Sequence, residues 1–339
     1  PTMKAFATAV VLCFSLMSTM HAAIFVAQPS YVDTNWSTAA LWEQGDFPRA
    51  LGDEAVITNV YIGNITGART ILLDIAATVT AVRFRGGTTS NCYPQVSSMD
   101  KRLYLQSASG NAQIEADSFS PQSWGSALKM PLVFLSDTDM RVTTNKIFAI
   151  AADSEFHGTG DLHLYSLLAN SVVALRANAS PNYTGTIYVE SSIGDTGVRL
   201  EAQSYICTNA RIVIRRGAIL TLGSVAQCGK VISMEPGSRM DAFSSTTPSN
   251  AADVVILGGV VTNFLRKSTF MNSRGDVSGT GTLVQVILNN PGGSNIFTGS
   301  ISPGLNGTGK LTIDEQQGVT LLGMPGAPVT LNIEDGDQL

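Results

Sequence analysis

The feature that most constrains this chain is an internal repeat in which a glycine corner leads directly into a short strand. The sequence Gly-Thr-Gly, followed each time by alternating apolar residues, begins and ends at Gly158 and Gly160, at Gly279 and Gly281, and at Gly307 and Gly309. Glycine allows the positive φ of a sharp corner, and alternation places apolar side chains on one face of the strand. A unit this short cannot bury its apolar face alone, so the repeat predicts units that stack on one another.

A second unit, in which an asparagine precedes an aromatic residue followed by Thr-Gly, comes after the first two corners. Its residues are Asn182, Tyr183 and Gly185 in one copy, and Asn295, Phe297 and Gly299 in the other. The asparagine can cap a turn or form a ladder with an asparagine on the next coil. The aromatic ring is suited to fill the interior of a coil or a corner. From corner to asparagine the spacing is 24 residues in the first copy (158 to 182) and 16 in the second (279 to 295).

Short alternating runs bounded by Gly, Asn, Asp or Ser recur along the chain, whereas helical periodicity is almost absent. These runs lie at residues 102–106, 112–116, 211–214, 218–222 and 230–234. Each predicts a strand that turns its apolar residues toward one interior and its Thr, Arg, Gln or Ser toward water. A β-sandwich would also contain such strands. The repeated corners favour a β-solenoid instead.

The two units together resemble the autotransporter-associated β-strand repeat of large secreted bacterial proteins. The residues before the first corner are also similar to that family: Trp36, Trp42, 45–48, 52–57, 70–74, 78–84 and 131–142. The resemblance implies a right-handed parallel β-helix, with Trp36 and Trp42 in a cap over the first coil. It also implies export, as an autotransporter passenger or a sorting-tag surface protein associated with the outer membrane of a Gram-negative-type bacterium.

The N-terminal segment, residues 1–23, predicts a signal peptide. A lysine precedes an apolar run at residues 5–17, which is too short to be a permanent membrane span, and small residues close the segment. A buried N-terminal helix is the alternative interpretation. We expect residues 24–100 to form the N-terminal cap and first coils. Residues 101–339 then form the β-helix repeat region, which we expect to be truncated at its C-terminus.

The composition limits the partners. Charged residues make up 14% of the 339 positions, glycine occupies 32, and the net charge is −5. No basic cluster exists beyond Arg215 and Arg216, so the chain lacks a surface that would neutralise phosphates, and we expect no nucleic-acid partner. Extracellular glycans, matrix or neighbouring cells remain as partners. Contact with a membrane is expected only through an anchor outside this chain.

The cysteines leave two possibilities open. Cys207 and Cys228 are 21 residues apart (207 to 228), about one turn of a solenoid, so they are expected on adjacent coils. They could form a disulfide bond there, or serve as two buried thiols that act as small apolar residues.

The search for catalytic residues favours a structural or adhesive protein without enzymatic activity, cofactor or metal. His157 and His163 flank the first corner without metal-ligand spacing, and we expect them to be corner or surface histidines. Parallel β-helices also include polysaccharide lyases and glycoside hydrolases, which need gathered carboxylates and, for a lyase, a basic residue. Asp137 and Asp139 with Arg141 are candidates for that alternative. A phage-type fibre is a further alternative, which the signal segment disfavours.

Overall fold

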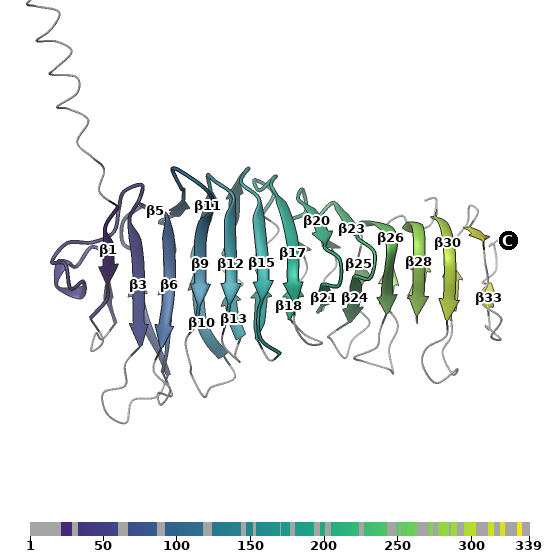
Figure 1. Cartoon of the computed structure of the whole chain (residues 1–339), viewed down its shortest axis with the longest axis horizontal. Coiled ribbons are helices and arrows are strands. Elements are labelled where there is room, and N and C mark those ends of the chain that lie inside the picture. The colour runs from purple at the N-terminus through teal and green to yellow at the C-terminus, as the bar shows by residue number, and fades with distance from the viewer. Residues whose placement is uncertain are drawn as a thin grey trace, which may run out of the picture.

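The computed structural model describes residues 22–28, 33–59, 67–86, 92–117, 124–143, 147–151, 154–169, 171–176, 180–192, 197–200, 205–223, 227–242, 249–250, 252–262, 271–273, 277–284, 286–289, 295–302, 311–314, 319–322 and 331–333. The predicted signal peptide lies outside these ranges except for its last two residues. The structure is nearly all-β, and its strands pair with the preceding and following coil in parallel. This arrangement confirms the predicted parallel β-solenoid. Figure 1 shows the coils side by side along one long axis, with the N-terminal coil at one end.

One ladder of strands runs through the described length of the solenoid. In order of pairing it comprises β1 (Ile24–Val26), β3 (Glu54–Asn59), β6 (Ala81–Gly86), β9 (Ala112–Ala116), β12 (Thr138–Val142), β15 (Leu162–Ser166), β17 (Thr186–Ser192), β20 (Arg211–Ile214), β23 (Val231–Met234), β26 (Asp253–Thr262), β28 (Val277–Val284), β30 (Asn295–Ser302) and β32 (Val319–Leu322). Neighbouring strands of a sheet lie about 4.8 Å apart, so each coil advances the chain by that distance.

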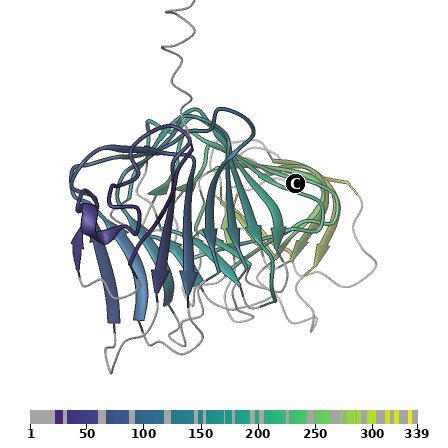
Figure 2. The same ribbon diagram turned by 60° about the vertical axis from the view of Figure 1, so that its left-hand side comes forward.

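A second ladder lies on another side of the same coils. It comprises β2 (Thr34–Asn35), β4 (Gly67–Leu72), β7 (Cys92–Ser97), β10 (Trp124–Lys129), β13 (Ile147–Ile150), β16 (Val172–Leu175), β18 (Val198–Leu200), β21 (Ile219–Leu222) and β24 (Arg239–Ala242), and it ends on the second half of β26. Figure 2, turned toward the N-terminal end, shows strands on different sides of a common interior.

Shorter ladders complete the coils. The first contains β5 (Ala77–Val79), β8 (Leu103–Leu105), β11 (Leu132–Phe134) and β14 (Phe156–Gly158). The others contain β19 (Tyr205–Ile206) with β22 (Gln227–Cys228), and β25 (Ser249–Asn250), β27 (Met271–Ser273), β29 (Val286–Asn289), β31 (Leu311–Asp314) and β33 (Leu331–Ile333). The helical element of the described part is the 3-10 turn η1 (Ala39–Leu41). None of the described helical structure is long and apolar enough to span a membrane.

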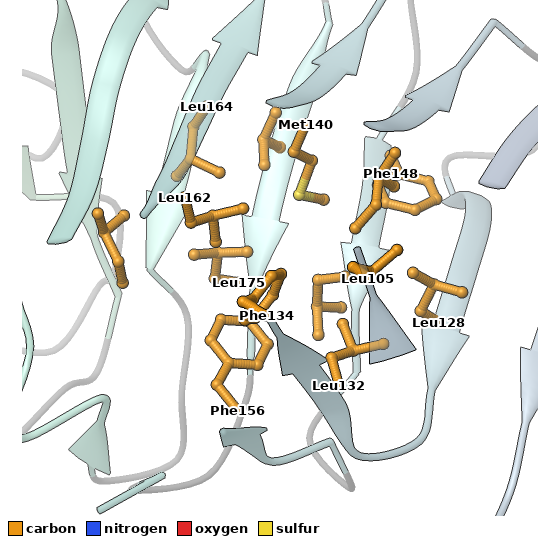
Figure 3. Packing of buried hydrophobic residues seen from close by; sticks show 14 of the residues in the cluster. Leu105, Leu128, Leu132, Phe134, Met140, Phe148, Phe156, Leu162, Leu164 and Leu175 are labelled. Carbon is orange, nitrogen blue, oxygen red and sulfur yellow. The ribbon is translucent and has the colours of Figure 1, made fainter. Parts of the chain in front are cut away.

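Alternating strands place apolar side chains in the interior. In β9 and β15 every second residue is buried, as the alternation in the sequence predicts. Ile114, Met140 and Leu164 therefore form one inward column across three successive coils. In Figure 3, side chains from the different ladders meet in this interior, among them Phe134, Phe148 and Leu175. Removal of this apolar surface from water is the main favourable contribution to folding.

The two tryptophans that were expected in a cap lie buried at the N-terminal end of the described stack. Trp36 packs against Trp42 with ring centroids 5.1 Å apart, and Phe25 of β1 contacts Trp42 at 6.5 Å. Each indole N–H has a backbone partner, because Trp36 donates to the carbonyl oxygen of Pro48 and Trp42 donates to that of Trp36. The rings thus add apolar area without leaving a buried donor unsatisfied.

Candidate functional site

The first glycine corner, residues 158–160, lies between β14 and β15 and stacks on the coil that follows it. Gly158 forms a parallel bridge with Tyr183. The N–H of Gly158 donates to the carbonyl oxygen of Asn182 at 3.2 Å, and its own carbonyl oxygen accepts the N–H of Thr184 at 3.1 Å. The φ of Gly158 is +97°, which residues with a side chain rarely adopt. The two sequence units therefore occupy the same corner on adjacent coils.

Close approach of the backbones requires glycine at two further positions. A Cβ atom on Gly160 would lie 2.3 Å from the carbonyl oxygen of Ser136, on the coil before it. A Cβ atom on Gly185 would lie 2.3 Å from the carbonyl oxygen of Gly160. Real Cβ atoms essentially never approach another atom closer than 3.0 Å. Ser136, Gly160 and Gly185 thus form a column in which the coils are in direct backbone contact.

Tyr183 fills the interior beside this column. Its side chain is buried, and its hydroxyl donates to the carbonyl oxygen of Gly160 at 3.1 Å. The ring packs edge-on against Phe134 and Phe156, with centroids 5.5 and 5.8 Å away. Burial raises the pKa of the Tyr183 hydroxyl, so the group stays protonated and can donate.

The second copy of the repeat uses the same register. Gly279 pairs with Phe297 and Gly281 pairs with Gly299, between β28 and β30. Gly279 has a φ of +102°, and a Cβ there would lie 2.0 Å from the carbonyl oxygen of Ile256. Asn295 is the first residue of β30. The two copies therefore have the same pairing at the corner, and the difference in spacing lies in the chain between the corner and the next coil. The third corner, with Gly307 and Gly309, lies outside the described residues.

Cys207 and Cys228 lie on adjacent coils, as their spacing predicts. Cys228 pairs with Ile206, the neighbour of Cys207. Both thiols are fully buried and they are not joined by a disulfide bond. Burial raises the pKa of Cys207, and it raises that of Cys228 to about 12. Of the two possibilities left by the sequence, the structure shows the buried thiols.

We expect both thiols to resist alkylation while the protein is folded. The thiolate is the reactive form, and a pKa of about 12 for Cys228 lowers its thiolate fraction at neutral pH roughly a thousandfold relative to an exposed cysteine. Mass spectrometry after treatment with iodoacetamide, with and without denaturant, measures this protection. Rapid labelling of either residue in the native protein would show that the coil interior opens there.

The outer face of the first ladder carries a second connected set of side chains, which we call the polar ladder. It comprises Asp139, Arg141, His163, Tyr165, Tyr188, Glu190, Arg215 and Glu235. These residues come from β12, β15 and β17 and from the positions directly after β20 and β23. Parallel pairing in register keeps them on one side of the solenoid.

A three-layer stack occupies the centre of the polar ladder. The His163 ring lies on the Tyr188 ring with centroids 4.8 Å apart and planes inclined by 11°. The Arg215 guanidinium also lies against the Tyr188 ring, at 4.5 Å from its centroid. Since His163 and Arg215 belong to the coils on either side of Tyr188, we infer that they cover opposite faces of its ring.

Glu190 links the members of this stack. It lies in a β-bulge of β17, because Leu164 pairs with Val189 while Tyr165 pairs with Ser191. A bulge redirects the side chain of the extra residue. One carboxylate oxygen of Glu190 is 2.7 Å from Nδ1 of His163, and the other is 3.5 Å from Nε of Arg215.

Both ends of the polar ladder are closed by arginine–carboxylate pairs. Arg141 donates to Asp139 at 2.7 Å, and its guanidinium lies 5.0 Å from the centroid of the Tyr165 ring. Arg215 donates to Glu235 at 2.6 Å. This hydrogen bond lowers the pKa of Glu235 and raises that of Arg215. Both groups therefore carry their charges at neutral pH.

Similar pairs continue along the face toward the N-terminus. Arg83 pairs with Glu54 at 3.0 Å and with Glu115. Arg85 pairs with Glu115 at 2.9 Å and with Asp117. Single exposed pairs contribute about 0 to 1 kcal/mol, but connected pairs on successive coils also hold the register of the ladder.

The carboxylates that the sequence suggested for catalysis do not converge. Asp137 accepts the backbone N–H of Asp161 from the next coil at 2.9 Å. Asp139 accepts a hydrogen bond from Asn111 at 2.7 Å and pairs with Arg141. Both carboxylates therefore connect coils.

The two histidines have different surroundings. His157 lies in β14 just before the corner and is buried rather than at the surface, with Nε2 3.3 Å from a carboxylate oxygen of Glu155. His163 belongs to the polar ladder. No group of three or more His, Cys, Asp or Glu side chains that could hold a metal ion occurs among the described residues.

Sequence reasoning missed Tyr165, Tyr188, Glu190 and Glu235. The only signal available was their place in alternating strands, and that signal predicts exposure without predicting partners. Comparison with known proteins finds no matching family model, no similar curated protein and no similar solved structure.

Proposed function

We propose that this chain is a passenger-like repeat region of an exported bacterial protein, with a structural or adhesive role and no enzymatic activity. The resemblance of its corner units to autotransporter-associated β-strand repeats supports the proposal, as does the parallel solenoid on which they stack. Such a protein presents a long, stiff face at the cell surface or outside the cell. Its partners would be extracellular glycans, matrix or neighbouring cells.

The observation that carries this proposal is the engagement of the carboxylates on the outer face. Asp139, Glu190 and Glu235 each lie within ion-pair distance of an arginine. A lyase of the metal-assisted kind uses carboxylates to hold a cation, and a hydrolase needs one carboxyl group that can give up a proton. Carboxylates neutralised by arginine suit neither task, whereas they do stabilise a rigid face that other molecules can contact.

One contact favours a second candidate, a secreted β-helix polysaccharide lyase or glycoside hydrolase. The distance of 2.7 Å between His163 and Glu190 is typical of a base and the group that orients it. Arg215 beside them could neutralise an acidic sugar. The same pair also serves as one more contact between coils, and the structural role needs no substrate.

A single assay separates these candidates. The purified full chain is incubated with insoluble and soluble polysaccharides, and both the bound protein and the released products are measured. We expect binding to some polymers without new reducing ends and without unsaturated uronate products. Products that disappear in a His163→Gln variant would contradict the non-enzymatic proposal.

The proposed location is tested on intact cells of the source organism. Protease added outside the cells should remove an epitope within residues 101–262, while a cytoplasmic control protein survives. Protection of the epitope until the cells are lysed would contradict surface exposure.

A further inference from the structure

In the polar ladder each arginine side chain is more exposed than the carboxylate with which it pairs. The Arg141 side chain is 41% exposed, whereas that of its partner Asp139 is 8% exposed. The Arg215 side chain is 39% exposed, and its partners Glu190 and Glu235 are 20% and 30% exposed. The guanidinium group is therefore the more accessible charge in each of these pairs.

The two arginines are held in place before any ligand arrives. The guanidinium of Arg141 lies against Tyr165, and that of Arg215 lies against Tyr188. Each is also fixed by a hydrogen bond to a carboxylate. A long side chain that is already ordered loses less conformational entropy on binding, so these groups are suited to recognition.

The ring contacts favour acidic ligands over neutral ones. Proteins bind neutral sugars largely by stacking them on open aromatic faces, but His163 and Arg215 already lie against Tyr188. Arg141 likewise lies against Tyr165. A ligand can use the guanidinium N–H groups that remain, since Nη2 of Arg141 donates to Asp139 and Nη1 of Arg215 donates to Glu235. A guanidinium has five donors in a planar fork, which matches a carboxylate.

The geometry of the solenoid favours a linear ligand. Arg141 follows Met140 of β12, and Arg215 follows Ile214 of β20, with β15 and β17 between these strands. At about 4.8 Å per coil the two positions are roughly 14 Å apart along the axis. A polymer with a carboxylate on its successive units, lying along the axis, can reach both.

We propose that the polar ladder is a binding site for an acidic polysaccharide that carries uronate carboxylates, with Arg141 and Arg215 as the binding residues. This inference rests on the proposed adhesive function and specifies its partner. The polymer is held by several weak, salt-sensitive contacts, since each guanidinium remains paired with its own carboxylate.

The test uses alginate as the uronate polymer and dextran as the neutral polymer. Affinity electrophoresis of the full chain at low ionic strength should show retardation by alginate and none by dextran. In an Arg141→Gln/Arg215→Gln variant, the apparent affinity for alginate should fall by about tenfold or more. Wild-type retardation should also decline steeply as salt is added.

Arg49 supplies the matched control. It also lies on an aromatic ring, 4.5 Å from the centroid of Phe47, and pairs with Asp46, but it lies outside the polar ladder. An Arg49→Gln variant should bind alginate like the wild type. An Arg141→Lys/Arg215→Lys variant keeps the charge and loses the fork, and should bind with intermediate affinity. If the glutamine variant does not fold, the lysine variant still tests whether the two guanidinium groups bind alginate.

Equal retardation of the wild type and a folded glutamine variant would overturn the inference, as would equal retardation by alginate and dextran. The proposed function fails separately. If the wild type binds other extracellular polymers but not alginate, only the uronate-binding site is contradicted. If it releases products from a polysaccharide, the non-enzymatic function is contradicted.

Discussion

Replacing Gly160 with alanine is expected to destabilise the solenoid by more than about 3 kcal/mol, above the usual range for overpacking. The new methyl group would lie 2.3 Å from the carbonyl oxygen of Ser136. A side chain could rotate away from such a contact, but a backbone oxygen cannot. The two coils must therefore separate at this corner, and the hydrogen bonds between β12 and β15 lengthen with them.

Gly110 provides the control for this substitution. It has a φ of +70°, and a Cβ there meets nothing within 4 Å. Alanine at Gly110 therefore carries only the cost of the left-handed conformation, about 1 to 2 kcal/mol. Denaturant unfolding followed by circular dichroism gives both values. If the two alanine variants are equally stable, close packing of the coils is not what requires glycine at Gly160.

Hydrogen exchange shows which coils the Gly160→Ala substitution destabilises. Each coil of a solenoid contacts only its neighbours, so a defect at one corner weakens the adjacent coils first. Protection in the Gly160→Ala variant should fall in β12, β15 and β17 and persist in β23. A uniform loss of protection would indicate that the stack unfolds as one unit.

The sequence was sufficient to predict the fold because the relevant signals are local. Alternation over residues 112–116 and 211–214 predicts strands, and these are β9 and β20. The repeated glycine corners predict stacking, since one unit cannot bury its own apolar face. Glycine at the corner is also a local signal, because the positive φ and the close backbone contact depend on the absence of a side chain at that one residue.

The polar ladder could not be predicted in the same way, because its members become neighbours only across coils. The coil from Met140 to Leu164 is 24 residues (140 to 164), and that from Ile212 to Ile232 is 20 (212 to 232). An error of one residue in coil length moves every outward side chain to the inner face. The bulge at Glu190 introduces such a shift within one strand, and no local pattern indicates it.

The second large effect is expected at Tyr183, where the sequence itself offers a control. Tyr183→Ala should cost about 3 to 5 kcal/mol, because it leaves a cavity beside Phe134 and Phe156 in the interior. Tyr183→Phe should cost only about 1 kcal/mol, for the hydrogen bond to Gly160. The equivalent position in the second copy is Phe297, which pairs with Gly279 as Tyr183 does with Gly158.

Denaturant unfolding of the two variants distinguishes the contributions of ring and hydroxyl at this corner. A large loss in the alanine variant with a small loss in the phenylalanine variant would mean that the repeat selects an aromatic ring as the filling of its corner. Similar losses in both would mean that the hydroxyl is essential to this coil. In that case the unit of asparagine, aromatic residue and Thr-Gly would not be one interchangeable structural element, and its two copies would not be equivalent.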